Sequence, residues 1–585
     1  MPNHSGRPLA ARGRRIAACT ALALSAGMLL SAPAAADDTV PPRAGIEQVR
    51  PGAPQQPTLT LPERGERSER FAAGAEGAVD GAKPRTDIDN DGFSDLFYRA
   101  NNGKLYVLAS ATGDEHEYTI NGDQGELSKD IIAPGDLDGG GGPEFLTLSA
   151  SGKLSLFQSW GDTNTGYVTW SGTGWQAYNK VFAPGDLNGD GRGDVLARTP
   201  AGELYLYVSN GAVDSNPFRT RIKVGTGWGQ FDQLSGANDV NGDGFGDVFA
   251  RTTGGDLYFY AGTGNTASPL KSRVKVGTGW GQYNQIVGVD DQDGDGLGDV
   301  IARTPAGQLY YYESNGSGNF RAKQTAGSGW HGAALFVGAG SNPHFGKSEV
   351  MGLTTGGTLF YYYGLNNGLL STRQQISDTG GWSGAKPVFA SSLDDWGRGD
   401  LLEVYDNKLY NYSHEHGIYT IGSGWAQYNT IVGPGDLNGD GKGDLLTRTP
   451  GGTLYLQRGN GEGSAFASRI NVGSGWGQYN KLVGAGDLTG DGRADLLART
   501  PGGTLYLYAG TGNSSAAFKA RTKIGTGWNQ YTKLAAPGDI NGDGRADLLA
   551  ANSAGELFRY HAKGTGQFTA KAKIGNGWGT YRDLY

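Results

Sequence analysis

Short runs rich in hydrophobic residues recur along the chain from Asp87 onward, and glycine, proline or asparagine separates them. The unit that begins at Asp186 is the clearest example, and its four runs cover residues 195–198, 203–208, 219–224 and 231–235. Runs of this length that are rich in β-branched and aromatic residues and bounded by turn residues predict short β-strands. Each unit is therefore expected to contain four strands.

The pattern repeats about every 50 residues, and ten units can be followed, one of them degraded near Ser392 and one without its acidic loop near Ser341. Four strands in such a unit match one blade of a β-propeller. Apolar side chains occupy both alternate positions of 204–207, which fits a strand covered on both faces by neighbouring blades. A solenoid with shorter repeats and parallel strands is the alternative. The sequence thus predicts an all-β fold, a β-propeller of ten four-stranded blades.

The ends of the repeat region bear on the number of rings. Residues 578–585 match the first strand of a unit, and no such strand precedes the loop at Asp87, so we expect strand exchange to close a ring. Units four and nine share the sequence Ala-Gly-Thr-Gly-Asn, and units five and ten share one tryptophan spacing, which indicates a duplication of five units. We therefore predict two five-bladed propellers, 87–340 and 341–585, with a strand near 335–338 closing the first. A single ten-bladed ring is the alternative.

The N-terminal residues have the features of an export signal. Basic residues that include the Arg14-Arg15 pair precede an apolar stretch at 16–30, and three alanines that end at Ala36 follow it. We predict a signal peptide at 1–36, cleaved near Ala36, and a secreted, extracellular protein. Both the general secretory route and the twin-arginine route fit the sequence. Residues 37–86 lack periodicity and contain seven prolines, so they are predicted to form a disordered linker.

The composition argues against a disordered chain and limits the kinds of partner the protein can bind. Glycine accounts for 102 of 585 residues, yet 29 Tyr, 20 Phe and 12 Trp are too many buried-type side chains for a disordered coil. Removal of 1–36 takes away four Arg and the only cysteine, Cys19, and changes the formal net charge from −8 to −12. No disulfide is then possible, and metal ions could stabilise the turns instead. The acidic balance excludes nucleic acid as a partner, and no later apolar run could span a membrane.

An acidic loop between the first two strands of most units carries candidate chemistry. Its pattern places oxygen side chains at positions 1, 3, 5 and 9 and glycine at position 6, which suits a hard cation, above all Ca²⁺. An EF-hand would need Glu at position 12, where the loop of Asp186 has Ala197. We expect the loops of the second unit, where Gly140 replaces the acid, and of the unit at Ser392 to be empty. The predicted metal ligands are Asp87, Asp89, Asp91, Asp95, Asp186, Asn188, Asp190, Asp194, Asp239, Asn241, Asp243, Asp247, Asp291, Asp293, Asp295, Asp299, Asp436, Asn438, Asp440, Asp444, Asp487, Thr489, Asp491, Asp495, Asp539, Asn541, Asp543 and Asp547.

The segments 183–196 and 433–446, with their Gly-Asp-Leu-Asn-Gly-Asp-Gly core, resemble FG-GAP or VCBS-type repeats, as in the integrin alpha head and in propeller lectins. The resemblance covers 87–585. It implies a β-propeller with calcium in a hairpin loop of each blade, and often a role in adhesion or glycan binding.

Tryptophan ends a Gly-x-Gly-Trp motif in eight units, and an aromatic residue follows three positions later in most of them. Trp beside flexible glycines can stack on a sugar face, with Asn179, Asn284, Asn429 or Asn480 as hydrogen-bonding neighbours. Packing between blades is the alternative role, and it is the commoner one. Similarity to tachylectin-type propellers favours glycan binding. The candidate ligand-binding residues are Trp175, Trp228, Trp280, Trp425, Trp476, Trp528 and Trp578.

A second recurring residue is an arginine twelve positions after the start of the acidic loop, at Arg99, Arg198, Arg251, Arg303, Arg448 and Arg499. It could bind an acidic sugar, but an ion pair with a neighbouring carboxylate is the stronger expectation.

Enzymatic motifs are missing from the sequence. The seven histidines follow no metal-site spacing, and neither Gly-x-Ser-x-Gly nor the sialidase box is found. We predict a non-catalytic, secreted calcium-binding protein that binds carbohydrate or an extracellular protein ligand through many copies of one site. A protein-adhesion scaffold and a glycosidase or lyase are the alternatives.

Overall fold

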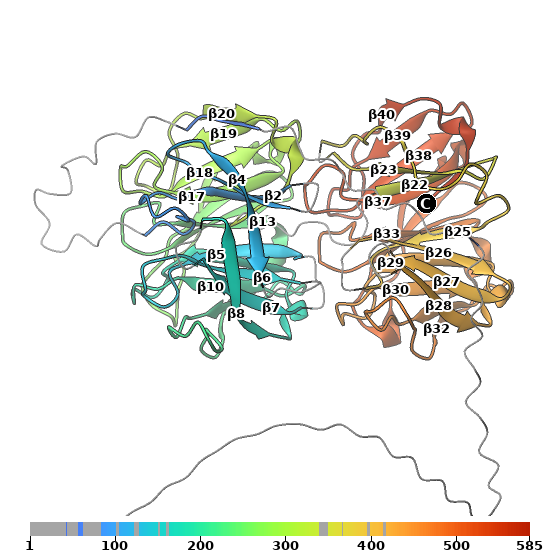
Figure 1. Ribbon diagram of the computed structural model, residues 1–585, viewed down its shortest axis with the longest axis horizontal. Coiled ribbons are helices and arrows are strands. Elements are labelled where there is room, and N and C mark those ends of the chain that lie inside the picture. The colour runs from blue at the N-terminus through green and yellow to red at the C-terminus, as the bar shows by residue number, and fades with distance from the viewer. Residues whose placement is uncertain are drawn as a thin grey trace, which may run out of the picture. The chain divides into compact units, whose positions relative to one another are not determined.

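The computed structural model describes residues 43, 57–61, 83–100, 104–121, 128–149, 152–159, 163–338, 349–365, 367–394, 398–413 and 417–585. The predicted signal peptide at 1–36 and most of the predicted linker lie outside the described residues. Within them the fold is all-β, built from four-stranded antiparallel sheets that correspond to the predicted units (Figure 1). The predicted propeller class is thus confirmed.

Residues 87–338 form five sheets, and the strands of each sheet follow one another in space in the order in which they are named. They are β21 (Ala333–Phe336), β2 (Leu96–Ala100), β3 (Leu105–Leu108) and β4 (Glu115–Asn121); β5 (Asp130–Gly135), β6 (Glu144–Leu148), β7 (Leu154–Gln158) and β8 (Thr165–Gly172); β9 (Lys180–Gly185), β10 (Asp194–Arg198), β11 (Leu204–Tyr207) and β12 (Ile222–Gly225); β13 (Phe231–Asn238), β14 (Asp247–Thr252), β15 (Leu257–Tyr260) and β16 (Val274–Gly277); and β17 (Gln285–Asp290), β18 (Asp299–Arg303), β19 (Leu309–Tyr312) and β20 (Gln324–Ser328). A parallel pairing of β4 with β8 joins the first two sheets.

Residues 349–585 form the other five sheets. They are β41 (Tyr581–Leu584), β22 (Glu349–Thr354), β23 (Leu359–Tyr363) and β24 (Gln374–Gln375); β25 (Pro387–Ala390), β26 (Asp400–Tyr405), β27 (Lys408–Ser413) and β28 (Gly417–Ser423); β29 (Thr430–Gly435), β30 (Asp444–Arg448), β31 (Leu454–Gln457) and β32 (Ile470–Gly473); β33 (Lys481–Gly486), β34 (Asp495–Arg499), β35 (Leu505–Tyr508) and β36 (Thr522–Gly525); and β37 (Tyr531–Gly538), β38 (Asp547–Asn552), β39 (Leu557–Tyr560) and β40 (Ala572–Gly575).

Two of these sheets are completed by strand exchange. Strand β21 pairs with β2, with Phe336 opposite Tyr98, and the C-terminal strand β41 pairs with β22, with Leu584 opposite Gly352. Both closing strands come from more than 200 residues away in the sequence. The two exchanges predicted from the ends of the repeat region are therefore present.

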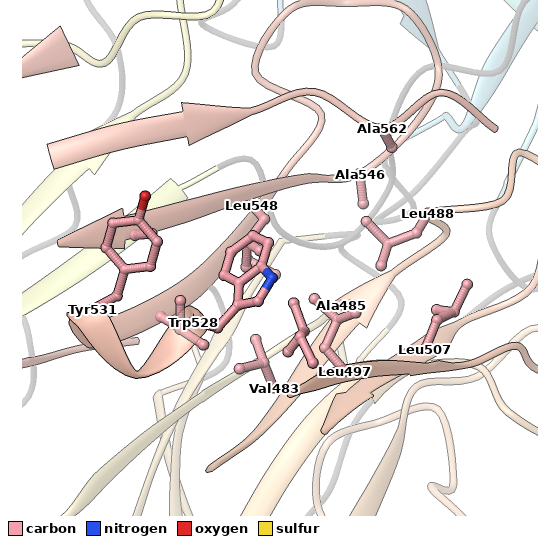
Figure 2. Close-up of a cluster of buried hydrophobic side chains, with 14 residues drawn as sticks. Val483, Ala485, Leu488, Leu497, Leu507, Trp528, Tyr531, Ala546, Leu548 and Ala562 are labelled. Carbon is pink, nitrogen blue, oxygen red and sulfur yellow. The ribbon is translucent and has the colours of Figure 1, made fainter. Parts of the chain in front are cut away.

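Ten hydrophobic clusters hold the sheets together, and each combines side chains from two neighbouring sheets. Figure 2 shows one of them, in which Trp528 lies among Val483 and Leu497 of one sheet and Leu548 of the next. Five clusters link the sheets of 87–338 into one closed circuit, and the other five link those of 349–585 into a second. The division into propellers at 87–340 and 341–585 stays a prediction, which these circuits favour.

Each Gly-x-Gly-Trp motif forms a short 3-10 turn that begins at the tryptophan. The preceding glycine is left-handed, with φ of 83° at Gly227, and this is why glycine is needed there. The turns that begin at tryptophan are η2 (Trp175–Ala177), η3 (Trp228–Gln230), η4 (Trp280–Gln282), η5 (Trp330–Gly332), η6 (Trp425–Gln427), η7 (Trp476–Gln478), η9 (Trp528–Gln530) and η10 (Trp578–Thr580), and η8 (Ser514–Ala516) lies in a loop. Among the described residues, no helix has the length and apolar character needed to cross a bilayer.

The predicted disordered linker at 37–86 is wrong for its described parts. Strand β1 (Thr58–Leu59) pairs with the outer strand β20, and the carbonyl of Thr58 accepts a hydrogen bond from the indole nitrogen of Trp330 at 2.8 Å. The guanidinium Nε of Arg43 lies 3.0 Å from a carboxylate oxygen of Glu403. Local sequence could not reveal these contacts, because their partners lie hundreds of residues away.

Arg85, another residue of that segment, is buried at the centre of the first circuit, where its side chain is 4% exposed. Its Nη1 donates to the carbonyl of Ala183 at 2.6 Å, and Nη2 donates to those of Gly236 and Gly288 at 3.3 and 3.2 Å. These carbonyls belong to β9, β13 and β17, the first strands of three successive sheets. Nε pairs with Oδ1 of Asp290 at 2.7 Å. One side chain thus fills the space around which these strands are arranged.

Candidate metal loops and ligand-binding surfaces

The acidic loops share one backbone conformation, which the loop between β9 and β10 illustrates. Oδ1 of Asp186 accepts a hydrogen bond from the amide of Gly189 at 2.7 Å, and Oδ2 accepts one from Gly191 at 2.6 Å. Gly191 has φ of 80°, so position 6 requires glycine. The first-position aspartate therefore folds the loop around its own carboxylate. The six other predicted loops repeat the bond from position 6 to this aspartate.

The ninth-position acid has a second role that the sequence did not reveal. Oδ2 of Asp194 accepts from the amide of Leu187 at 3.0 Å, and Oδ1 accepts from Ser209, beyond the next strand, at 3.1 Å. This acid, which we call the brace, ties the loop to the following hairpin in all seven predicted loops. Glu144 and Asp400 accept the same loop amide in the two units whose loops were expected to be empty. The brace therefore persists where other ligand positions are lost.

Burial and mutual repulsion act on the loop carboxylates. Burial raises the pKa of Asp194 to about 7 and that of Asp444 to about 8, and neighbouring loop acids add to the rise, while backbone hydrogen bonds oppose it. A bound cation would offset both effects by stabilising the charged form. Oxygen donors that converge in a tight loop are the ligands that Ca²⁺ prefers, so the residues fit this ion.

Among the described residues, three loops bring three carboxylates within 4.8 Å of one another. Two of them were predicted, Asp87 with Asp89 and Asp95, and Asp291 with Asp293 and Asp295. The third is the second unit, where Asp136, Asp138 and Glu144 converge. This loop, predicted to be empty because Gly140 replaces an acid, keeps three carboxylates close together, because the ninth-position Glu has a longer side chain than Asp and reaches the other two.

The candidate ligand-binding tryptophans lie between the sheets. Trp175, Trp228, Trp280, Trp425, Trp476, Trp528 and Trp578 are only 7–8% exposed, and each belongs to an inter-sheet cluster. In six of the seven, a tyrosine of the adjacent sheet covers one indole face with ring centroids 4.6–4.8 Å apart. The structure thus corrects the sugar-stacking role: a covered ring packs against the next sheet instead.

The recurring arginines clamp neighbouring sheets together. Nε of Arg198 donates to Oδ1 of Asn179 at 3.1 Å, and Nη1 donates to the carbonyls of Trp228 and Phe231 at 3.1 and 2.6 Å, in the turn of the next sheet. Arg303, Arg448 and Arg499 make the same contacts. The predicted ion pair exists only at Arg251 among these described residues, with Asp232 at 2.9 Å. At Arg198, Arg303, Arg448 and Arg499 an asparagine takes the place of the acid, so each of the four asparagines proposed as ligand contacts orients an arginine.

A repeated surface feature was not predicted from the sequence. In seven sheets an exposed Arg or Lys of the outermost strand region lies over a half-buried aromatic ring of the third strand, 4.0–4.9 Å from its centroid. We call these the cation–aromatic pairs. They could have been found from the alternation in runs such as Leu-Tyr-Leu-Tyr, whose first tyrosine faces outward. Their members are Arg221 and Tyr205, Arg273 and Tyr258, Lys323 and Tyr310, Arg373 and Phe360, Arg469 and Tyr455, Arg521 and Tyr506, and Lys571 and Phe558.

Comparison with known families identifies residues 436–498 and 487–550 as FG-GAP-like repeats, in agreement with the resemblance seen in the sequence. No curated protein matches the chain. Among solved structures, the BP39L lectin from Burkholderia pseudomallei is 13% identical and aligns over 68% of this chain and 99% of its own, with a TM-score of 0.25. Sqt1 from Saccharomyces cerevisiae is 10% identical and aligns over 77% of this chain and 87% of its own, with a TM-score of 0.21. BBS1N in complex with ARL6DN is 13% identical and aligns over 59% of this chain and 83% of its own, also with a TM-score of 0.21. At these scores the likeness identifies no function.

Proposed function

We propose that this protein is a secreted β-propeller that is stabilised by calcium and binds carbohydrate through many copies of one surface site. The observation that carries the proposal is the repetition of the cation–aromatic pair in seven sheets. Repeated weak sites gain avidity only against a ligand that is itself repetitive. A polysaccharide or a glycan-coated surface is such a ligand.

The chemistry of the pair suits a sugar. In one copy Arg221 lies 4.3 Å over the Tyr205 ring and donates to the Tyr178 hydroxyl, so its guanidinium plane is held at the surface. Its other N–H donors point along that plane and can bond sugar hydroxyls or carboxylates. An aromatic edge beside such donors is a common arrangement in polar ligand sites.

Calcium would support this surface indirectly. Each brace joins the metal loop to the hairpin that follows the third strand, as Asp194 does with Ser209. The ring of a cation–aromatic pair stands on that third strand. A cation that orders the loop would therefore also order the surface that binds the ligand.

A glycan array on the mature protein, run with calcium and with chelator, tests the proposal. We expect binding in calcium that falls when Arg221→Gln, Arg273→Gln and Arg521→Gln are combined, because avidity multiplies the loss at each site. Lys104→Gln is the matched control, since Lys104 is exposed and pairs with Glu117, which is also exposed, at 2.7 Å. A blank array from folded, calcium-saturated protein would reject carbohydrate binding and move the search to protein ligands.

A further inference from the structure

The first strands of the second circuit surround a cavity of about 770 Å³. Strands β25, β29, β33, β37 and β41 all contribute to its wall. This volume lies within the range of about 300–1,000 Å³ that is typical of small-molecule sites. The corresponding centre of the first circuit holds the Arg85 side chain, whose guanidinium bonds to three of the surrounding strands. The space in the second circuit is thus large enough for a ligand.

Basic residues dominate the charge of this cavity. Lys386, Arg448, Lys481 and Arg582 line it, and Asp583 is the single acidic side chain among its described lining residues. Nζ of Lys481 lies 3.2 Å from Oδ1 of Asp583, so this acid balances one of the four cations. The side chains that line the cavity therefore leave an excess of positive charge, which attracts an anion.

The neighbours of Arg448 fix its guanidinium without neutralising it. Nε donates to Oδ1 of Asn429 at 3.1 Å, Nη2 donates to the Thr430 hydroxyl at 2.8 Å, and Nη1 donates to the carbonyls of Trp476 and Tyr479. All of these acceptors are uncharged. Arg198 makes the equivalent clamp but is only 1% exposed, whereas Arg448 is half-buried and faces the cavity. The same set of hydrogen bonds that holds a buried arginine at Arg198 therefore holds a guanidinium that is open to the cavity at Arg448.

Arg582 and Lys386 complete the basic group. Arg582 is exposed and donates through Nη2 to the carbonyl of Ala385, which is also uncharged. Lys386, which directly follows Ala385 in the sequence, is also exposed. Two exposed cations beside one fixed guanidinium can bind a carboxylate from more than one direction.

We propose that this cavity binds a saccharide of one or two rings that carries a carboxylate. The class of ligand rests on the proposed carbohydrate function, and no member of a cation–aromatic pair lines the cavity, although Arg469 of one pair donates to the hydroxyl of the lining residue Tyr428. Tyr428 and Tyr585 supply aromatic surface, and Asn480 supplies an amide, so the wall offers partners for the ring and hydroxyls of a sugar as well as for its charge. The charge selects acidic over neutral sugars.

Isothermal titration of the calcium-saturated mature protein with glucuronate, glucose and inorganic sulfate tests this assignment. We expect glucuronate to bind at least about tenfold more tightly than glucose, since one charge-assisted hydrogen bond contributes that much. The double variant Lys386→Gln/Arg582→Gln should lose about tenfold or more in glucuronate affinity. Lys523→Gln, which removes a charge on the outermost strand β36, should lose nothing. The affinity of the unmodified protein should also fall as salt rises, a measurement that needs no variant.

Three results would overturn the assignment. They are equal affinity for glucuronate and glucose, full affinity in a double variant whose melting temperature is unchanged, and sulfate binding as tight as glucuronate binding, which would indicate a general anion site. If the array still shows glycan binding in these cases, only the cavity assignment is wrong, and the proposed function stands. If neither the array nor titration detects any saccharide, the proposed function fails as well.

Discussion

Replacing Arg85 with alanine should destabilise the first circuit strongly. Arg85 and Asp290 are 4% and 3% exposed, and removal of one partner of such a pair leaves a buried charge, which costs about 3–5 kcal/mol. Asp290 would keep the hydrogen bond from the backbone amide of residue 85 at 2.6 Å and the one from the Ser94 hydroxyl. We therefore expect a loss near 3 kcal/mol, which for a unit of this size lowers the melting temperature by roughly 6–12 °C.

Differential scanning calorimetry of the calcium-saturated protein measures this loss. Lys223→Ala is the control, because Lys223 and its partner Glu203 are 47% and 35% exposed and their pair should contribute less than about 1 kcal/mol. The double variant Arg85→Met/Asp290→Asn removes both charges and should be more stable than Arg85→Ala. A melting temperature for Arg85→Ala within about 2 °C of the unmodified protein would refute the reasoning, since it would show that the pair is not buried in solution.

Three further predictions concern the metal loops and the tryptophans. Chelation should lower the melting temperature and calcium should restore it. An unchanged melting temperature in EDTA would show that the ion does not stabilise the fold. In EDTA the free energy of unfolding should fall as pH rises from about 5 to 8. Burial raises the pKa of Asp194 to about 7 and that of Asp444 to about 8, so in this range the folded chain holds protons that the unfolded chain has already released near pH 4. Bound calcium should weaken this dependence. Trp228→Ala should cost about 3–5 kcal/mol of unfolding free energy, and a variant that lost glycan binding with an unaltered melt would contradict the packing role.

Local pattern was enough to predict the strands and the loops. The same four runs recur in most units, so turn residues and alternation identify the sheet, and the fixed spacing from Asp186 to Asp194 identifies the loop. Strand exchange could also be predicted, because the extra run at 581–584 had no partner nearby. These features depend on residues that are close in sequence or on a simple count of strands.

The predictions that failed depend on what lies across the interface between sheets. Whether Trp228 is open or covered is decided by Tyr260, a residue of the next sheet whose ring centroid is 4.7 Å away. The burial of Arg85 is decided by carbonyls of three separate sheets, which are 98 to 203 residues distant. Such partners are set by the closed packing, which composition and periodicity do not describe.

Closure by a distant strand has a consequence for how the protein reaches its native state. Strand β2 pairs with β21, and β22 pairs with β41, across more than 200 residues, so neither circuit can close until nearly its whole length of chain is available. Contacts of such high separation slow folding. Until they form, β2 and β22 are unpaired edges able to join a strand of another molecule. Aggregation during folding should therefore compete with ring closure, and conditions that order each sheet early should improve the yield of native protein.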